Sequence, residues 1–144
     1  MRLDYAKVAP DGYKAMLALY QYLPKTSLDM KLVHLLWLRV SQINGCAYCV
    51  DLHARDALQA GVLQRKVNAV VVWHETPFFT ESERAALAWA EALTRIVETR
   101  APDSDFEALK QHFSEKEITD LTYAICMMNG LNRLAIGFRK GPAA

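Results

Sequence analysis

The sequence lacks any long apolar segment and any marked excess of charge. No stretch approaches the roughly 18 uninterrupted apolar residues that a membrane-spanning helix needs. Residues 1–5 contain no apolar signal core, since Asp4 stands where one would begin. The formal net charge of +1 gives no electrostatic reason to bind nucleic acid or anionic lipid. We therefore expect a protein of the reducing cytoplasm that has neither nucleic acid nor membrane as a partner.

Cysteine is scarce as well. Three cysteines, an odd number, do not fit a structural disulfide framework. Cys46 and Cys49 lie three positions apart and are therefore expected to have a chemical function. Cys126 lies in the apolar run 123–128, and we expect it to be a small buried side chain.

Patterns typical of β-structure are almost absent. Residues 70–72 are the one β-like run, and no second run could pair with it, so we expect a short helix there. The 144 residues predict a single all-α domain over residues 1–144, a helical bundle of about six to seven helices. Hydrophobic residues make up 52% of the chain, which indicates that some apolar surface meets another subunit. The expected helices are residues 10–23, 29–44, 47–60, 63–73, 80–97 and 114–135.

Several helix starts are encoded locally. Ser27 or Asp29 can cap the helix that ends at Asn44. Residues 80–83 and 114–117 are capping boxes, in which a hydroxyl residue is followed three positions later by glutamate. The helix that ends at Asn44 is apolar on nearly all sides, so we expect it to be central and buried.

The most informative segment begins at the break Asn44-Gly45. Cys46, Cys49 and His53 follow it at positions i, i+3 and i+7, which places them on one face of the next helix. Unpaired N–H groups and the positive end of the macrodipole favour a thiolate at a helix start, and the thiolate is the reactive form of cysteine. The pattern indicates a dithiol redox centre.

His34 is a candidate partner for this centre. If the two helices fold back on each other at Gly45, His34 lies about 15 Å from the break and His53 about 12 Å, at roughly 1.5 Å per residue. Burial disfavours a charged imidazole, so His34 could act as a neutral base toward the thiol. The alternative is a core histidine whose nitrogen is satisfied by a backbone carbonyl.

A zinc site is the main competing interpretation of these residues. His34, Cys46, Cys49 and His53 together would form a Cys₂His₂ set, which zinc accepts. Three of these ligands come from less than two turns of one helix, which strains a tetrahedral arrangement. We therefore favour the redox centre and expect no bound metal ion.

Residues 38–53 closely resemble the signature of the alkylhydroperoxidase D-like branch of the carboxymuconolactone decarboxylase superfamily. Further matches follow at residues 73–75, 79–94 and 132–135, so the resemblance covers roughly residues 28 to 139. It implies an all-α fold that assembles into trimers or hexamers, and thiol-dependent reduction of hydroperoxides.

The resemblance also implies individual roles. Cys49 corresponds to the cysteine that attacks the peroxide, Cys46 to the resolving cysteine that closes the disulfide, and His53 to the histidine of the proton relay. No bound cofactor is implied, and an external dithiol, a lipoyl group or a thioredoxin-like protein, would restore the thiols. The family usually has a glutamate twelve residues before the first cysteine, and this chain has His34 there.

Three other functions fit part of the pattern. The decarboxylase activity that names the superfamily has no evident need for a dithiol. A redox-regulated binding or chaperone-like protein would use the disulfide to switch an apolar surface. A zinc-stabilised structural module would use the same four side chains as metal ligands.

Overall fold

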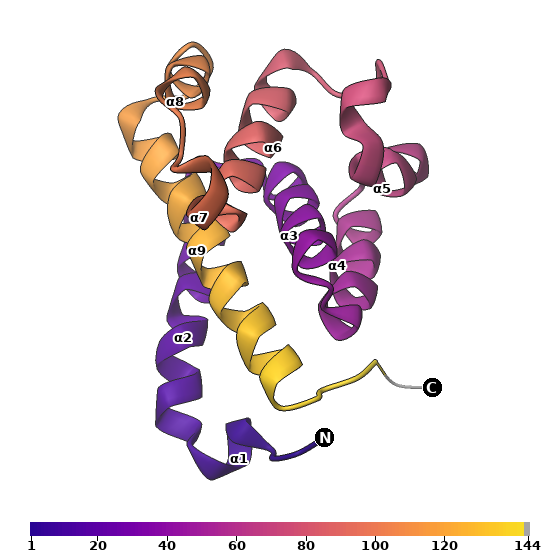
Figure 1. Cartoon of the computed structure of the whole chain (residues 1–144), viewed down its shortest axis with the longest axis vertical. Coiled ribbons are helices and arrows are strands. Elements are labelled where there is room, and N and C mark those ends of the chain that lie inside the picture. The colour runs from indigo at the N-terminus through magenta and orange to yellow at the C-terminus, as the bar shows by residue number, and fades with distance from the viewer. Residues whose placement is uncertain (143–144) are drawn as a thin grey trace.

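The computed structural model describes residues 1–142, and these residues contain helices and connecting loops with no strand (Figure 1). The predicted all-α fold is confirmed. The α-helices are α1 (Tyr5–Val8), α2 (Pro10–Tyr22), α3 (Met30–Asn44), α4 (Ala47–Gln59), α5 (Gln64–Ala69), α6 (Glu81–Thr94), α7 (Ile96–Thr99), α8 (Asp103–Lys110) and α9 (Glu115–Gly137). Two 3₁₀ helices, Leu23–Lys25 and Val70–Glu75, complete the set within residues 1–142.

The number of helices differs from the expected six to seven, because short helices occur where the sequence shows no long periodic pattern. The four-residue helix α1 and the eight-residue helix α8 were not expected. The expected helix over residues 80–97 is divided, because Arg95 leaves the helical conformation at φ −102° and ψ 35°. The hydroxyl of Thr99 then donates a hydrogen bond of 2.6 Å to the carbonyl of Ala92, which holds α7 against the end of α6.

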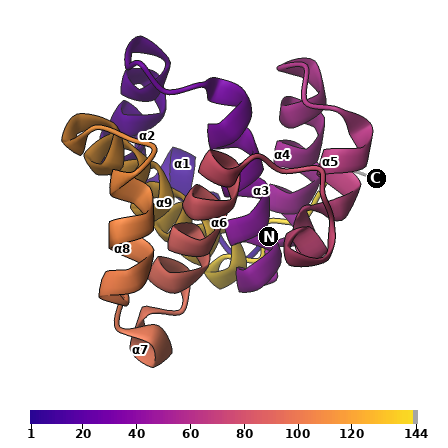
Figure 2. The same cartoon turned by 90° about the horizontal axis from the view of Figure 1, so that it is seen from above.

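Helix α3 forms the centre of the molecule, as predicted. Nine of its 15 residues are buried, and it packs against α4, α6 and α9 (Figure 2). Trp37 is fully buried at its middle, where the ring stacks on Tyr20 and the indole N–H donates to the carbonyl of Ala124 at 3.1 Å. Asp29 caps the helix, since its carboxylate accepts from the backbone N–H of Lys31.

The break between α3 and α4 depends on Gly45. Its backbone has a φ of +72°, in the left-handed region that glycine enters without steric cost. The N–H of Gly45 donates to the carbonyl of Gln42, and the N–H of Cys46 donates to that of Ser41. Helix α4 therefore folds back beside α3, and Cys46 becomes its N-cap residue (Figure 1).

The N-terminal helices α1 and α2 lie on the outside of the molecule, beside α9. No side chain of α1 or α2 is buried within the chain, although α2 packs against α9. The backbone N–H of Arg2 donates to the carbonyl of Phe138 at 2.7 Å, which ties the N-terminal segment to the end of α9. Within residues 1–142, no helix combines the length and apolar character needed to cross a membrane.

Candidate functional site

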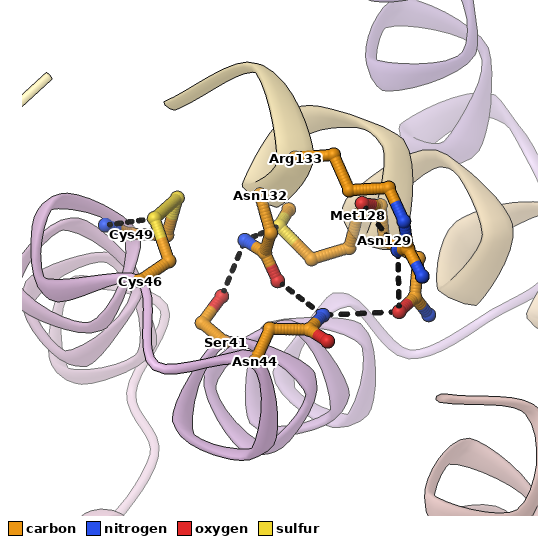
Figure 3. The surroundings of a disulfide bond; sticks show 8 residues. All are labelled: Ser41, Asn44, Cys46, Cys49, Met128, Asn129, Asn132 and Arg133. Carbon is orange, nitrogen blue, oxygen red and sulfur yellow. Dashed lines mark hydrogen bonds between the residues drawn. A yellow bond between two sulfur atoms is a disulfide. The ribbon is translucent and has the colours of Figure 1, made fainter. Parts of the chain in front are cut away.

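The first feature of the site is a disulfide at the start of α4. Cys46 and Cys49 are joined, with their Cα atoms 5.3 Å apart, and both side chains are buried (Figure 3). The sulfur of Cys46 accepts a hydrogen bond of 3.3 Å from the backbone N–H of Cys49. A sulfur at an N-cap position lies at the positive end of the helix dipole, which stabilises negative charge on it after reduction.

The two cysteines line different hollows. Cys49 lines a cavity of about 390 Å³, together with His53 and Asp56 of the same helix. Cys46 lines a second hollow of about 210 Å³, where Arg139 and Lys140 contribute positive charge. A molecule in the first cavity can therefore reach one cysteine, and a molecule in the second hollow the other.

Four tyrosines line the wall of the larger cavity. They come from three helices: Tyr5 from α1, Tyr13 and Tyr20 from α2, and Tyr48 from α4. Burial raises the pKa of Tyr5 and Tyr20, so their hydroxyl groups stay protonated and can donate hydrogen bonds. The cavity thus combines aromatic faces with neutral donors.

His34 and His53 meet across the interface of α3 and α4. Each ring packs against Trp37, with ring centroids 5.3 Å apart in both cases. One ligand-capable atom from each of His34, His53 and Asp56 lies within 4.8 Å of the others. The sequence-based placement of the two imidazoles at similar height agrees with this arrangement.

Neither histidine is satisfied in the way a core histidine would be. The Nδ1 atoms of His34 and His53 are buried, and neither has a hydrogen-bond partner within the described part of the chain. The Nδ1 atom of His53 lies 3.7 Å from a carboxylate oxygen of Asp56, beyond hydrogen-bond length. The structure therefore does not favour the alternative in which a backbone carbonyl holds His34.

Both imidazoles are neutral at neutral pH. Burial, and to a smaller extent the nearby His34, lowers the pKa of His53 to about 4. Burial also lowers the pKa of His34, although the carboxylate of Asp56 opposes that change. A neutral imidazole carries a free lone pair, which can accept a proton or bind a metal ion.

Sequence reasoning did not find a polar network behind the disulfide. Asn132 of α9 donates to the hydroxyl of Ser41 at 3.1 Å, and Asn44 donates to the side-chain oxygens of Asn132 at 2.9 Å and Asn129 at 3.0 Å (Figure 3). These bonds fix the end of α3, and hence the break that leads to Cys46, against α9. The one signal in the sequence was an amide, Asn132, in an otherwise apolar stripe, and the structure shows that this side chain is fully buried.

Two more side chains differ from the sequence analysis. Asp56 was missed, although it lies three residues after His53 and hence on the same face of α4. Cys126 was expected to be buried and is exposed. It lies three residues after the exposed Tyr123 on the outer face of α9, while Ile125 and Met127 beside it point inward.

Comparison with known proteins identifies the chain's relatives. It is 34% identical to the uncharacterised protein YdfG of Bacillus subtilis over 135 residues, covering 94% of this chain and 92% of YdfG. The crystal structure of ATU0492 from Agrobacterium tumefaciens superimposes with a TM-score of 0.95 at 45% identity, covering 99% of this chain and 98% of that one. ATU0492 is a protein of unknown function with a suggested role in antioxidant defence as AhpD.

A more distant structure shares the fold. The apo debrominase Bmp8 superimposes with a TM-score of 0.83 at 25% identity, covering 94% of this chain and 73% of that one. Residues 10–92 of this chain match the carboxymuconolactone decarboxylase family. Together with the extensive similarity to YdfG and ATU0492, this match shows that the chain belongs to the carboxymuconolactone decarboxylase family, in its alkylhydroperoxidase D-like branch.

Proposed function

We propose that the protein is a dithiol peroxidase that reduces hydroperoxides through Cys46 and Cys49. The observation that carries the proposal is that Cys49 and His53 line one cavity while Cys46 lies within disulfide reach of Cys49. A cavity of about 390 Å³ is large enough for a small organic hydroperoxide. The suggested antioxidant role of ATU0492 agrees with this chemistry.

In the first step the Cys49 sulfur attacks an oxygen of the hydroperoxide. The O–O bond breaks, Cys49 becomes a sulfenic acid, and the alcohol leaves with the proton that the thiol has lost. His53 is neutral, so it can hold that proton between the thiol and the leaving alkoxide. We assign His34 to the same relay, since its imidazole adjoins that of His53.

In the second step the Cys46 sulfur displaces hydroxide from the sulfenic acid. The S–S bond forms and water leaves, which protects Cys49 from further oxidation. The hydrogen bond that the Cys46 sulfur accepts from the backbone N–H of Cys49 would stabilise the Cys46 thiolate for this attack.

In the third step an external dithiol reduces the disulfide and is itself oxidised. We propose a lipoyl group or a thioredoxin-like protein as the reductant, which reaches Cys46 through the hollow beside Arg139 and Lys140. A cycle that needs a dithiol reductant fits a reducing compartment, and we place the protein in the cytoplasm for that reason.

The test begins with intact mass and thiol counting. Protein with reduced thiols receives one equivalent of cumene hydroperoxide and then dihydrolipoamide. We expect the loss of two hydrogen atoms at Cys46 and Cys49, reversed by the dithiol. With both reagents in excess, each chain should then consume many equivalents of hydroperoxide.

Three variants separate the roles. Cys49→Ser should abolish turnover, whereas Cys46→Ser should react once and retain one added oxygen atom on Cys49. Cys126→Ser should match the wild type, because this exposed cysteine lies outside the site.

Consumption of a single equivalent of hydroperoxide, whatever reductant is supplied, would instead indicate a redox switch. Decarboxylation of carboxymuconolactone that survives the change of both site cysteines to serine would indicate the decarboxylase.

A further inference from the structure

Three side chains beside the dithiol converge in a way that the peroxidase cycle does not require. The cycle uses imidazole lone pairs, but it has no need for the carboxylate of Asp56, which faces His53 at 3.7 Å. His53 is neutral, and within the described residues Asp56 makes no ion pair with a lysine or arginine side chain. We infer that His34, His53 and Asp56 form a binding site for a divalent transition-metal ion such as Zn²⁺, with one coordination position open to the cavity.

The donor set fits this class of ion. Two neutral imidazoles and a carboxylate are the three protein ligands of many zinc sites that keep an open position. The same set suits other divalent transition metals, while Mg²⁺ and Ca²⁺ prefer all-oxygen ligands. The sulfurs of the alternative Cys₂His₂ set are joined to each other in this structure and are not available as thiolate ligands.

The environment supports the same conclusion. His53 is only 2% exposed, and its Nδ1 atom is buried without a hydrogen-bond partner. The Nδ1 atom of His34, on the facing helix α3, is also buried without a hydrogen-bond partner. Buried polar atoms are nearly always paired, so two unpartnered atoms on neighbouring imidazole rings need an explanation. An ion bound between the rings would use the lone pairs that the protein leaves free.

The geometry requires only side-chain adjustment. Ligands about 2.05 Å from a tetrahedral ion lie about 3.3 Å from one another. The separation of His53 and Asp56 is already 3.7 Å, and none of the three pairs exceeds 4.8 Å. His53 and Asp56 lie one helical turn apart on α4, so rotation of the side chains can close the set without moving the backbone.

The open position determines what the ion would do. His53 and Asp56 line the tyrosine-walled cavity, so the fourth ligand would be water or an oxygen atom of a bound molecule. The ion would also occupy the lone pair that His53 uses to hold a proton. If the proposed peroxidase function is correct, metal binding and turnover exclude each other; the site itself does not depend on that function.

The site is tested on oxidised protein, in which the disulfide removes Cys46 and Cys49 as ligands. The full chain with Cys126→Ser, which removes the remaining thiol, is titrated with Zn²⁺ by calorimetry and with Co²⁺ by visible absorption. We expect one ion per chain and a Co²⁺ spectrum of low coordination number. His34→Gln and Asp56→Asn should each weaken binding at least tenfold.

The controls are matched residues outside the site. His112→Gln removes an exposed histidine, and Asp51→Asn removes an exposed carboxylate on the same helix α4. Both should bind as the parent does. Circular dichroism confirms that each variant is folded; His53→Gln is avoided because it alters a buried side chain. Absence of binding at millimolar Zn²⁺, or binding that His34→Gln and Asp56→Asn leave unchanged, would overturn the inference. Peroxidase activity does not enter this test, so the two proposals fail independently.

Discussion

At the scale of single residues, the clearest departure from the family is His34 in the position of the usual glutamate. Its ring adjoins His53 and packs edge-on to Trp37, so it is placed to exchange a proton with the relay but is removed from the wall of the cavity. We therefore regard it as a residue that acts through His53.

This placement predicts the behaviour of His34→Ala. Peroxide turnover should fall at least about tenfold, because an acid–base group speeds the reaction by transferring a proton but is not the nucleophile that attacks the peroxide. A single addition of hydroperoxide should still form the disulfide, because both sulfurs are unaffected. His34→Glu, which restores the residue usual in the family, should recover turnover, and His112→Ala should have no effect. Unchanged turnover in His34→Ala would remove this residue from the mechanism.

Asn132 carries a second prediction at this scale. It is fully buried and bonds to Ser41 and Asn44. Asn132→Ala takes this donor from the buried Ser41 hydroxyl and leaves Asn44 with Asn129 as its remaining acceptor, so the free energy of unfolding should fall by about 1–3 kcal/mol. Urea denaturation measures the change. Lys14→Ala, at an exposed position of α2 outside this network, is the control and should change stability little. Equal effects in both variants would show that the network contributes nothing specific.

At the scale of elements, the turn between α3 and α4 positions the dithiol. Gly45 has a φ of +72°, but no atom lies within 4 Å of where a Cβ would be. Gly45→Ala should therefore cost only the backbone strain of the left-handed region, about 1–2 kcal/mol in urea denaturation. Gly12→Ala has the same open surroundings inside α2 without a positive φ, and it should stabilise the protein or leave it unchanged. Destabilisation of equal size in both variants would contradict the explanation that the positive φ of Gly45 causes the loss of stability.

Glu91 joins three elements and makes stability depend on pH. Its carboxylate accepts from Arg39 of α3 at 2.7 Å and from the indole N–H of Trp73 at 2.9 Å. Burial alone would raise the pKa of Glu91, but these hydrogen bonds outweigh it, and the pKa lies below the ordinary value of 4.5. The carboxylate therefore contributes stability above pH 4.5, and this contribution is lost as the pH falls through the lowered pKa.

Glu91→Gln tests this dependence. At pH 7 the free energy of unfolding should fall by about 3 kcal/mol, since Arg39 is left buried without its counter-charge. The difference between wild type and variant should shrink as the pH is lowered below 4.5, in urea denaturations repeated at each pH. Glu107→Gln, in an exposed ion pair with Lys110, serves as the control. A difference that stays constant with pH would mean that Glu91 is not the titrating group.

The sequence predicted elements better than it predicted the surroundings of the site. Both capping boxes and the Asp29 cap are present as expected, because each depends on atoms three residues apart or fewer. The approach of His34 to His53 followed from one tight turn. The tyrosine wall and Asn132 could not be predicted in the same way, because they meet the dithiol only through packing of distant segments.

At the scale of the whole molecule, one chain leaves large apolar side chains uncovered. Val97 is 75% exposed and Leu63 56% exposed, and helix α2 buries none of its side chains. Single exposed apolar residues are ordinary, but the high overall hydrophobic content makes association the better explanation of these together.

We predict a trimer or a hexamer in solution, which are the assemblies that the resemblance to the alkylhydroperoxidase D-like branch implies. Light scattering after gel filtration should give three or six times the chain mass of 16.3 kDa. Because the association would bury apolar surface rather than pair charges, 1 M salt should not dissociate it, whereas salt screens exposed ion pairs. Dissociation by salt would point to a charged interface instead. A monomer at every concentration would mean that these apolar side chains remain in contact with water, and the expected assembly would be wrong.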